Sequence, residues 1–264
     1  MFLKFRNGYG FGTKKQKEDT TKREMVLFCL SDLHGTCYEP RNRPIIECAW
    51  DQKPDLILAS GDMLSGDREE GDAIAVALLS RLSDLAPVCF VNGNHEMCVE
   101  RHQPERYQKF MDDLKNGGVQ VLHNETAYFW IDGEKVAVTG YELPWEYYRR
   151  FSRRHPSVVG MERSIGKRKQ DAYQILLTHN PVFFEEYTAW GADFTFAGHL
   201  HGGFIRLPYF GGVISPQFQL FPKYDHGLYQ MDTSSMVVGA GMGNHSGLFR
   251  INNPTEIVTV RIKR

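Results

Sequence analysis

The sequence predicts an α/β protein built as one large layered domain, and three features of the chain support this. Its 264 residues are long for one domain and short for two. From Met25 onward, apolar strand-like runs alternate with helical segments, without repeats or low-complexity linkers. Several of these runs stop abruptly at a glycine or another small residue beside Asp, Asn or His. We therefore expect a single domain over residues 25–264.

Residues 1–24 differ from the rest of the chain. They hold 7 Lys and Arg residues against 3 acidic residues, and glycines punctuate the start. We expect a basic, flexible arm that is dispensable for folding, because little in it can be buried to offset the cost of ordering. The alternative is a weak peripheral contact with an anionic membrane surface, helped by the apolar residues Phe2, Leu3 and Phe5.

Three segments carry the signals of helices. Residues 67–85 combine an acidic first turn with an apolar stripe at helical spacing. Residues 104–115 begin with proline and stop at a pair of glycines, and residues 181–190 also begin with proline. The C-terminal part, residues 211–264, instead holds short apolar runs separated by Gly, Asn and Pro. That pattern favours antiparallel strands that close a second sheet.

Five strand-like runs end in short polar motifs. The side chains that follow these runs, in chain order, are Asp32 and His34, Asp62, Asn94 and His95, His179, and His199 and His201. Ligand sites in α/β sheets form outside the carboxyl ends of the strands. We therefore expect these side chains to meet at one place.

The chemistry of this set predicts a two-metal site. Oxygen and imidazole ligands without thiolates suit Mn, Fe or Zn. Alternate residues of an extended segment share a face, so both side chains of Asp-x-His and His-x-His can reach one ion. Asp62 can bridge two ions with its two oxygens, and Asn94 adds a neutral ligand. Two divalent ions about 3.5–4 Å apart clamp a phosphoryl group and activate a water, while His95 stabilises charge or protonates the leaving oxygen.

These motifs resemble those of the calcineurin-like metallophosphoesterase superfamily, which read D-x-H, G-D, G-N-H-E/D, H and G-H-x-H. The resemblance covers about residues 25–264 and implies a four-layer α/β/β/α sandwich of two mixed sheets, with the site at one edge. It implies that one ion is held by Asp32, His34, Asp62 and His201. The second ion then takes Asp62, Asn94, His179 and His199, and His95 is the catalytic histidine.

A narrower resemblance follows the last motif. Residues 198–208, 224–229, 239–243 and 250–257 are similar to the branch that includes UDP-diacylglucosamine pyrophosphatases and cell-envelope phosphoesterases. This implies a small-molecule or lipid-linked phosphoester as substrate. Members of the branch often carry an N-terminal membrane anchor or export signal, which residues 1–12 do not resemble.

Charge and cysteine content limit the classes of partner and the cellular location that we expect. The formal net charge of -1 argues against nucleic acid as the main partner. No run approaches the roughly 20 apolar residues of a membrane span. The 5 cysteines form no CxxC pair, so a disulfide framework is not expected. We therefore expect a cytoplasmic protein, with the N-terminal arm as its one candidate contact with the inner face of the membrane.

Candidate substrate-binding residues are Arg206, His226, His245 and Arg250. The two arginines can pair with a phosphate oxygen; the alternative is that each forms a structural ion pair. Residues 145–154 mix aromatic side chains with arginines, either as a solvated helix face or as a cap that grips an apolar or base-bearing substrate. Cys37 and Cys98 follow site motifs and are interpreted as spectators, the alternative being a pair capable of reversible oxidation.

The sequence thus predicts a hydrolase that cleaves phosphodiester or pyrophosphate bonds by in-line attack of a metal-bound hydroxide, with His95 assisting the leaving group. One alternative is a phosphomonoesterase, and another is a non-catalytic metal-binding scaffold of the same fold. Scaffolds of that kind usually lose ligands or the catalytic histidine, and here every such position is kept.

Overall fold

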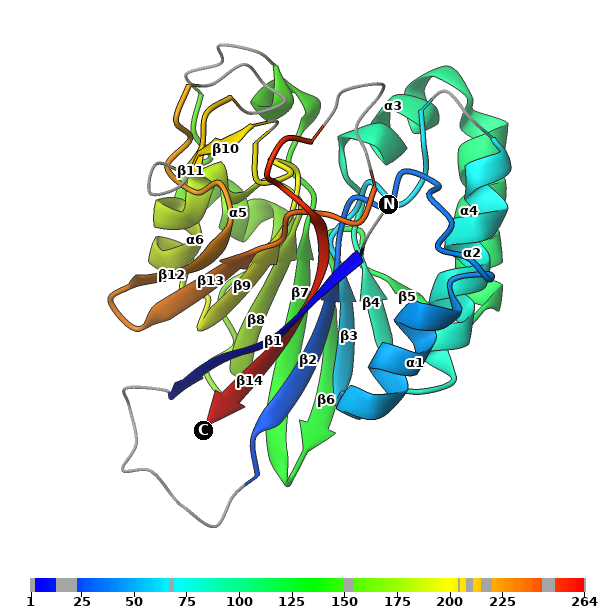
Figure 1. The fold of residues 1–264 in the computed structure, drawn as a ribbon. Coiled ribbons are helices and arrows are strands. Elements are labelled where there is room, and N and C mark those ends of the chain that lie inside the picture. The colour runs from blue at the N-terminus through cyan, green and yellow to red at the C-terminus, as the bar shows by residue number, and fades with distance from the viewer. Residues whose placement is uncertain are drawn as a thin grey trace.

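The computed structural model describes residues 3–12, 23–66, 69–149, 154–203, 205–207, 211–214, 220–243 and 250–263. Within these residues two six-stranded sheets pack face to face, and helices cover the outer face of each sheet (Figure 1). The expected α/β/β/α sandwich of two mixed sheets is confirmed.

The first sheet has the strand order β1-β14-β2-β3-β4-β5. Its strands are β1 (Leu3–Gly12), β14 (Thr255–Lys263), β2 (Met25–Leu30), β3 (Leu56–Ala59), β4 (Val88–Phe90) and β5 (Gln120–Val121). Strands β2 to β5 are parallel, whereas β14 is antiparallel to β2 and parallel to β1. Its outer face is covered by α1 (Arg43–Gln52), α2 (Glu70–Ser83) and α4 (Pro104–Asn116).

The second sheet has the order β12-β13-β9-β8-β7-β6. Its strands are β12 (Gly227–Met231), β13 (Ser234–Val238), β9 (Phe194–Ala197), β8 (Tyr173–Thr178), β7 (Glu134–Tyr141) and β6 (Thr126–Ile131). Four parallel strands, β7, β8, β9 and β13, are flanked by antiparallel partners. Helices α5 (Val158–Ile165) and α6 (Phe184–Trp190) cover its outer face.

The remaining elements connect these strands and helices. They are α3 (Asn94–His102), the 3-10 turns η1 (Trp145–Tyr148) and η2 (Pro181–Phe183), and a small ribbon of β10 (Arg206–Leu207) with β11 (Gly211–Gly212).

Side-chain alternation along the central strands builds two cores at once. Leu27 and Cys29 of β2 join the core between the sheets, where they meet residues of the second sheet such as Ile175. Their neighbours Phe28 and Leu30 point the other way and pack under the helices of the outer layer. Strands buried on both faces read as continuous apolar runs, which is why these runs stand out in the sequence.

Two of the expected helices are confirmed, as α2 and α4, with shifts of a few residues at their ends. Residues 67 and 68, at the expected start of the first one, lie outside the described residues. The third segment, 181–190, divides into the turn η2 and the short helix α6.

The C-terminal strands depart from the expectation in one respect. β12 and β13 do pair antiparallel in the second sheet, but residues 257–262 lie in β14, in the first sheet. Ile257 faces the helix-covered core, while Val258, Val260 and Ile262 face the core between the sheets. One face of the strand is apolar, and Ile257 and Thr259 are buried on the other, so the strand fits a place inside a sheet covered on both sides; that place is between β1 and β2.

The N-terminal residues also differ from the expected flexible arm. Residues 3–12 form β1, which pairs with β14 from Leu3 opposite Thr255 to Gly12 opposite Lys263. Tyr9 packs against the core between the sheets. The strand covers what would otherwise be the open edge of β14, where unpaired backbone groups are costly. The expectation of a flexible arm therefore does not hold for residues 3–12; residues 1, 2 and 13–22 lie outside the described residues.

Candidate metal centre

The predicted site residues follow the carboxyl ends of strands from both sheets. Asp32 and His34 follow β2, Asp62 follows β3, and Asn94 and His95 begin α3 just after β4. In the second sheet, His179 follows β8, and His199 and His201 follow β9. The structure brings carboxylates and imidazoles from the two sheets together in three overlapping groups.

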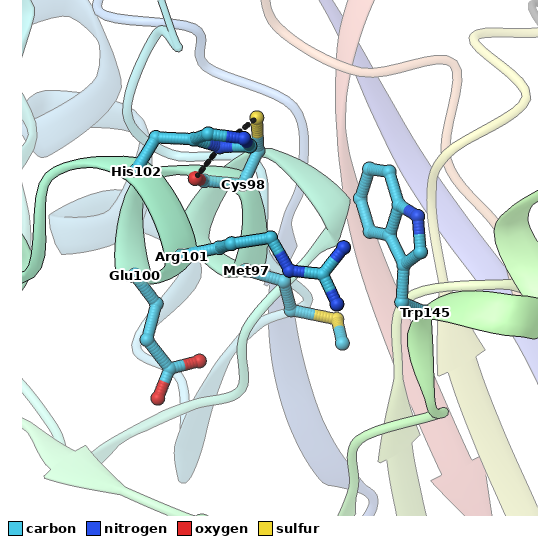
Figure 2. Close-up of a pocket in the computed structure, with 6 residues that line it drawn as sticks. All are labelled: Met97, Cys98, Glu100, Arg101, His102 and Trp145. Atoms are coloured by element: carbon cyan, nitrogen blue, oxygen red, sulfur yellow. Dashed lines mark hydrogen bonds between the residues drawn. The ribbon is translucent and has the colours of Figure 1, made fainter.

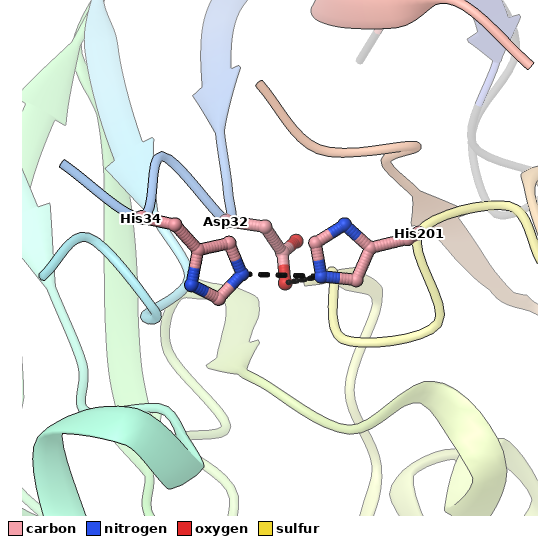
Figure 3. Close-up of side chains that lie close together, drawn as sticks. All are labelled: Asp32, His34 and His201. Atoms are coloured by element: carbon pink, nitrogen blue, oxygen red, sulfur yellow. Dashed lines mark hydrogen bonds and ion pairs between the residues drawn. The ribbon is translucent and has the colours of Figure 1, made fainter. Parts of the chain in front are cut away.

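Asp32, His34 and His201 form the first group, with one ligand atom of each within 4.8 Å of the others. His34 Nε2 lies 3.2 Å from His201 Nε2, which in turn lies 3.3 Å from Asp32 Oδ1 (Figure 3). The three side chains are buried and point toward a common point. This arrangement places two nitrogens and a carboxylate oxygen where a single cation can reach all of them.

Asp62, His179 and His199 form the second group, again with ligand atoms within 4.8 Å. His179 Nδ1 donates to the backbone oxygen of Ser60 at 2.6 Å. Its Nε2 lies 3.1 Å from Asp62 Oδ2. Metal-binding histidines typically donate their second ring nitrogen to a carbonyl in this way, which fixes the tautomer and orients the ligand atom.

His34, Asp62 and His95 form a third group, which joins the other two. The rings of His34 and His95 lie edge to face with their centroids 4.7 Å apart. Asn94 Oδ1 is a buried acceptor that finds no hydrogen-bond partner among the described residues. Since buried acceptors are normally satisfied, an unpartnered amide oxygen beside this cluster fits a metal ligand. The donor set therefore suits divalent ions.

Five of the seven predicted ligands have a left-handed backbone, which is uncommon outside glycine. Their φ angles are 53° for Asp32, 47° for His34, 52° for Asp62, 67° for His199 and 50° for His201. Strained conformations of this kind persist only where the surrounding structure fixes them, and they gather at functional sites.

Two glycines of the motifs leave space for the carboxylates. A Cβ added at Gly93 would lie 2.2 Å from Asp62 Oδ1, and one at Gly198 would lie 2.4 Å from Asp32 Oδ2. Either atom would overlap the oxygen. The glycines beside the motif residues therefore allow close approach of backbone to ligand.

Glu96 holds the backbone around the site, a role that sequence reasoning did not assign although the residue stands in a motif. Its carboxylate is fully buried and accepts hydrogen bonds from the backbone N–H groups of Asp62 (2.8 Å), Met63 (2.7 Å), Leu64 (3.2 Å) and Gly93 (2.8 Å). Burial and the Asp62 carboxylate raise the pKa of Glu96 to about 7, against the lowering effect of these donors.

Strong electrostatic coupling marks the centre. Burial raises the pKa of Asp32 to about 6, although His179 opposes the shift. Burial would also raise the pKa of Asp62, but His179 and His95 outweigh it and hold that pKa well below its usual range. Burial would lower the pKa of His179, yet the Asp62 carboxylate outweighs it and raises the pKa to about 9. The Asp62 carboxylate and the His179 imidazole thus favour each other's charged forms.

Tyr148 forms a wall of the centre. Its ring centroid lies 5.2 Å from that of His199 and 6.0 Å from that of His179. The residue belongs to η1, within the aromatic and arginine-rich segment 145–154. Residues 150–153 of that segment lie outside the described residues. One aromatic side chain of the segment thus contacts the site directly.

Among the predicted substrate residues that the structure describes, Arg250 lies against a candidate ligand. Its Nη2 lies 2.9 Å from His201 Nδ1. The guanidinium also donates to the backbone oxygens of Ala240 (2.6 Å) and Gly243 (2.5 Å). The contacts are therefore to an imidazole and to carbonyls, and Arg250 ties the loop after β13 to the centre.

The other predicted substrate residues have protein partners or lie outside the described residues. Arg206 Nη1 donates to Asp225 Oδ2 at 2.8 Å, and His226 Nε2 lies 2.7 Å from Glu256 Oε1. His245 is outside the described residues. Their contacts with substrate stay predictions.

All five cysteines lie in the described part of the chain, and all are free. Cys37 Sγ lies 3.6 Å from Glu39 Oε1, and Cys98 Sγ lies 3.6 Å from His102 Nδ1. A redox role for Cys37 and Cys98 stays untested.

The fold and the gathered donors define a metallophosphoesterase. Residues 25–203 match the family model for the calcineurin-like phosphoesterases, and the chain belongs to that family. Members of the family use divalent metals, which agrees with the side-chain groups found here. In the described residues, each helix is too short or too polar to cross a membrane.

Two relatives and two solved structures illustrate the similarity. The chain is 26% identical over 239 residues to phosphodiesterase YaeI of Escherichia coli (strain K12), covering 90% of this chain and 81% of that protein. It is 25% identical over 215 residues to the uncharacterized metallophosphoesterase YkuE of Bacillus subtilis (strain 168), covering 81% of this chain and 69% of that protein.

Similarity to the solved structures concerns the fold. The NAD nucleotidase NadN of Haemophilus influenzae superposes with a TM-score of 0.53 at 16% identity, over 83% of this chain and 45% of that one. The sulfate thiohydrolase SoxB of Thermus thermophilus gives a TM-score of 0.50 at 14% identity, over 84% and 53%. The chain spans about half the length of these two proteins.

Proposed function

We propose that the protein is a dinuclear metal-dependent phosphoesterase that hydrolyses phosphodiester or pyrophosphate bonds. The observation that carries this proposal is a pair of buried groups of possible ligands: one contains His34, the other contains Asp62, and a third group joins these two residues. Two adjoining sets of ligands suit two ions close together.

The residues sort into two ligand sets. Asp32, His34 and His201 would hold one ion with Asp62, and Asn94, His179 and His199 would hold the other with the same Asp62. The nitrogen and oxygen donors fit Mn²⁺, Fe or Zn²⁺. When bound, such ions neutralise phosphoryl oxygens and lower the pKa of a water molecule.

His95 is the candidate for assisting the leaving group. The Gly66 N–H donates to its Nδ1 at 3.3 Å, so the neutral ring carries its proton on Nε2. The ring lies beside His34 and Asp62, where this Nε2–H can donate a hydrogen bond to an oxygen leaving the phosphorus; full transfer of a proton requires the imidazolium form, which becomes neutral imidazole. Its backbone N–H donates to Asp62 Oδ1 at 2.8 Å, and this hydrogen bond fixes the position of His95 relative to the Asp62 carboxylate.

The surroundings favour a diester over a monoester. A monoester dianion needs cations beyond the metals, and the two arginines predicted for this task are engaged elsewhere. Arg206 is paired with Asp225, and Arg250 donates to backbone carbonyls and lies beside His201. The name of the Escherichia coli relative, a phosphodiesterase, points the same way. A small-molecule or lipid-linked phosphoester fits these observations. The free cysteines fit a cytoplasmic location, where thiols stay reduced.

The test is hydrolysis of bis(p-nitrophenyl) phosphate and of p-nitrophenyl phosphate by the full chain with added Mn²⁺. We expect a higher kcat/KM for the diester, and loss of both activities with a chelator. A clear preference for the monoester would assign a phosphomonoesterase instead. Binding of the metals without turnover of either substrate would indicate a non-catalytic scaffold.

A further inference from the structure

A hollow of about 300 Å³ lies between helix α3 and turn η1, lined by Met97, Cys98, Glu100, Arg101, His102 and Trp145 (Figure 2). We call it the α3–η1 hollow. Its volume is at the lower end of the range for small-molecule sites and is enough for one ring system. None of its lining residues is among the predicted site residues.

Each wall of the hollow belongs to an element that also reaches the metal centre, α3 through His95 and η1 through Tyr148. On α3, Cys98 and His102 follow His95 by three and seven residues, so they lie along the same face of the helix. On η1, side chains three residues apart in a 3-10 helix eclipse one another. Trp145 therefore lies on the same side as Tyr148, whose ring packs against His199. Both elements thus lead from the centre to the hollow.

The lining favours a flat aromatic group. The Arg101 guanidinium reaches from α3 toward the indole of Trp145, with Cζ 5.9 Å from the ring centroid. Trp145 is 37% exposed, so part of the indole is accessible. Met97 offers a thioether, a favourable neighbour for aromatic rings. Because Glu100 and Arg101 carry opposite charges, the lining does not select for an ionic group.

We propose that the α3–η1 hollow is a binding subsite for an aromatic substituent of the phosphoester substrate, which stacks on Trp145 and contacts the guanidinium of Arg101. This proposal rests on the proposed function, and it narrows the substrate class to esters with an aryl or nucleobase group. An alkyl chain of similar size gains apolar contact but neither stacking nor a cation–π interaction.

Binding of three phosphonates to the metal-loaded full chain, measured by titration calorimetry, tests the subsite. Phenylphosphonate, hexylphosphonate and methylphosphonate share the anionic group and differ in the substituent. We expect phenylphosphonate to bind roughly tenfold more tightly than methylphosphonate, the size of effect that stacking on an aromatic side chain supplies. Trp145→Ala should remove that preference, and Trp145→Phe should restore most of it.

The matched control is Trp130→Ala, which removes an exposed tryptophan of β6, a strand on the far edge of the second sheet, and should keep the preference. Equal binding of phenylphosphonate and methylphosphonate by the unaltered chain, or an unchanged preference in Trp145→Ala, would overturn the proposal. So would equal binding of hexylphosphonate and phenylphosphonate, which would mark a general apolar pocket.

The failure of this proposal and that of the proposed function are distinguishable. Methyl p-nitrophenyl phosphate reports hydrolysis by the unaltered chain, whatever the hollow binds. Hydrolysis without a phenyl preference would count against the subsite alone. A phenyl preference without any hydrolysis would count against the enzyme and leave the hollow as a binding site.

Discussion

Asp62 occupies the most constrained position in the centre. It has a φ of 52°, its Oδ1 accepts from the His95 N–H, and its Oδ2 lies 3.1 Å from His179. The residue also belongs to two of the three side-chain groups. A strained backbone and a fully buried carboxylate both lower the stability of the folded protein. That such a costly geometry is kept is typical of a functional site.

The first prediction concerns this carboxylate. Asp62→Asn should lower the occupancy of both metal sites and abolish turnover, because an amide offers one neutral oxygen where two ions share a charged group. Elemental analysis of the purified variant, beside a diester assay, measures both effects. Retention of two tightly held ions by the variant would show that Asp62 does not bridge them.

The second prediction concerns His95. His95→Ala should keep the metal content and lower kcat by roughly 10²–10⁴-fold, as expected for a lost general acid. The loss should shrink for substrates with good leaving groups such as nitrophenolate, which need little protonation. Because His95 lies near both His34 and Asp62, elemental analysis is the essential control. A variant that loses one ion would make His95 a ligand.

At the scale of the elements, the start of α3 and the loop after β3 are joined by Glu96. Four backbone N–H groups converge on this one buried carboxylate, one from the start of α3 and three from the loop that carries Asp62. The helix thus begins with its first turn tied to the neighbouring strand end. Buried donors that lose such an acceptor carry a desolvation cost of about 1–3 kcal/mol each.

The third prediction follows from this junction. Glu96→Gln should lower the melting temperature by several degrees, because one amide –NH₂ would face N–H donors, and each kcal/mol is worth about 2–4 °C in a chain of this size. Calorimetry measures the shift. Glu105→Gln, in the exposed first turn of α4, is the matched control and should change little. Equal melting temperatures for the two variants would contradict the role given to Glu96.

The element scale also shows what the sequence could predict. Strand ends beside Asp, Asn and His indicated which side chains gather in the three groups of the candidate metal centre, because strands buried on both faces produce continuous apolar runs. The function of Glu96 was not predictable, since a hydrogen bond to backbone groups more than 30 residues away leaves no local pattern. Nor was the place of β14, because alternation indicates which faces of a strand are buried but not which strands are its neighbours.

At the scale of the whole molecule, the first sheet is completed by the two ends of the chain. β1 pairs with β14, and β14 pairs with β2, so the N-terminal and C-terminal strands stand side by side (Figure 1). The metal centre lies at the carboxyl ends of the inner strands, and β1 carries none of the predicted site residues. Stability and catalysis are therefore separable in this part of the fold.

The fourth prediction uses that separation. Deleting residues 1–22 should lower the melting temperature by several degrees, because β14 loses its parallel partner and Tyr9 leaves the core between the sheets. Turnover of a soluble diester at 20 °C should change by less than twofold. Thermal melts and initial rates on the same preparations measure the two effects. An unchanged melting temperature would return residues 1–12 to the role of a dispensable arm.

The position of β14 has a consequence for the order in which the protein is made. The strand is made after every other described strand, yet it lies between the two described strands that come first in the sequence. Until it arrives, β1 has no partner and β2 presents an open edge, so the sheet that carries Asp32 and Asp62 stays incomplete throughout translation. Domains often fold as they emerge, but this one should wait for residues 255–263. Nascent chains stalled before residue 255 should therefore remain sensitive to protease, and should depend on chaperones until they are released.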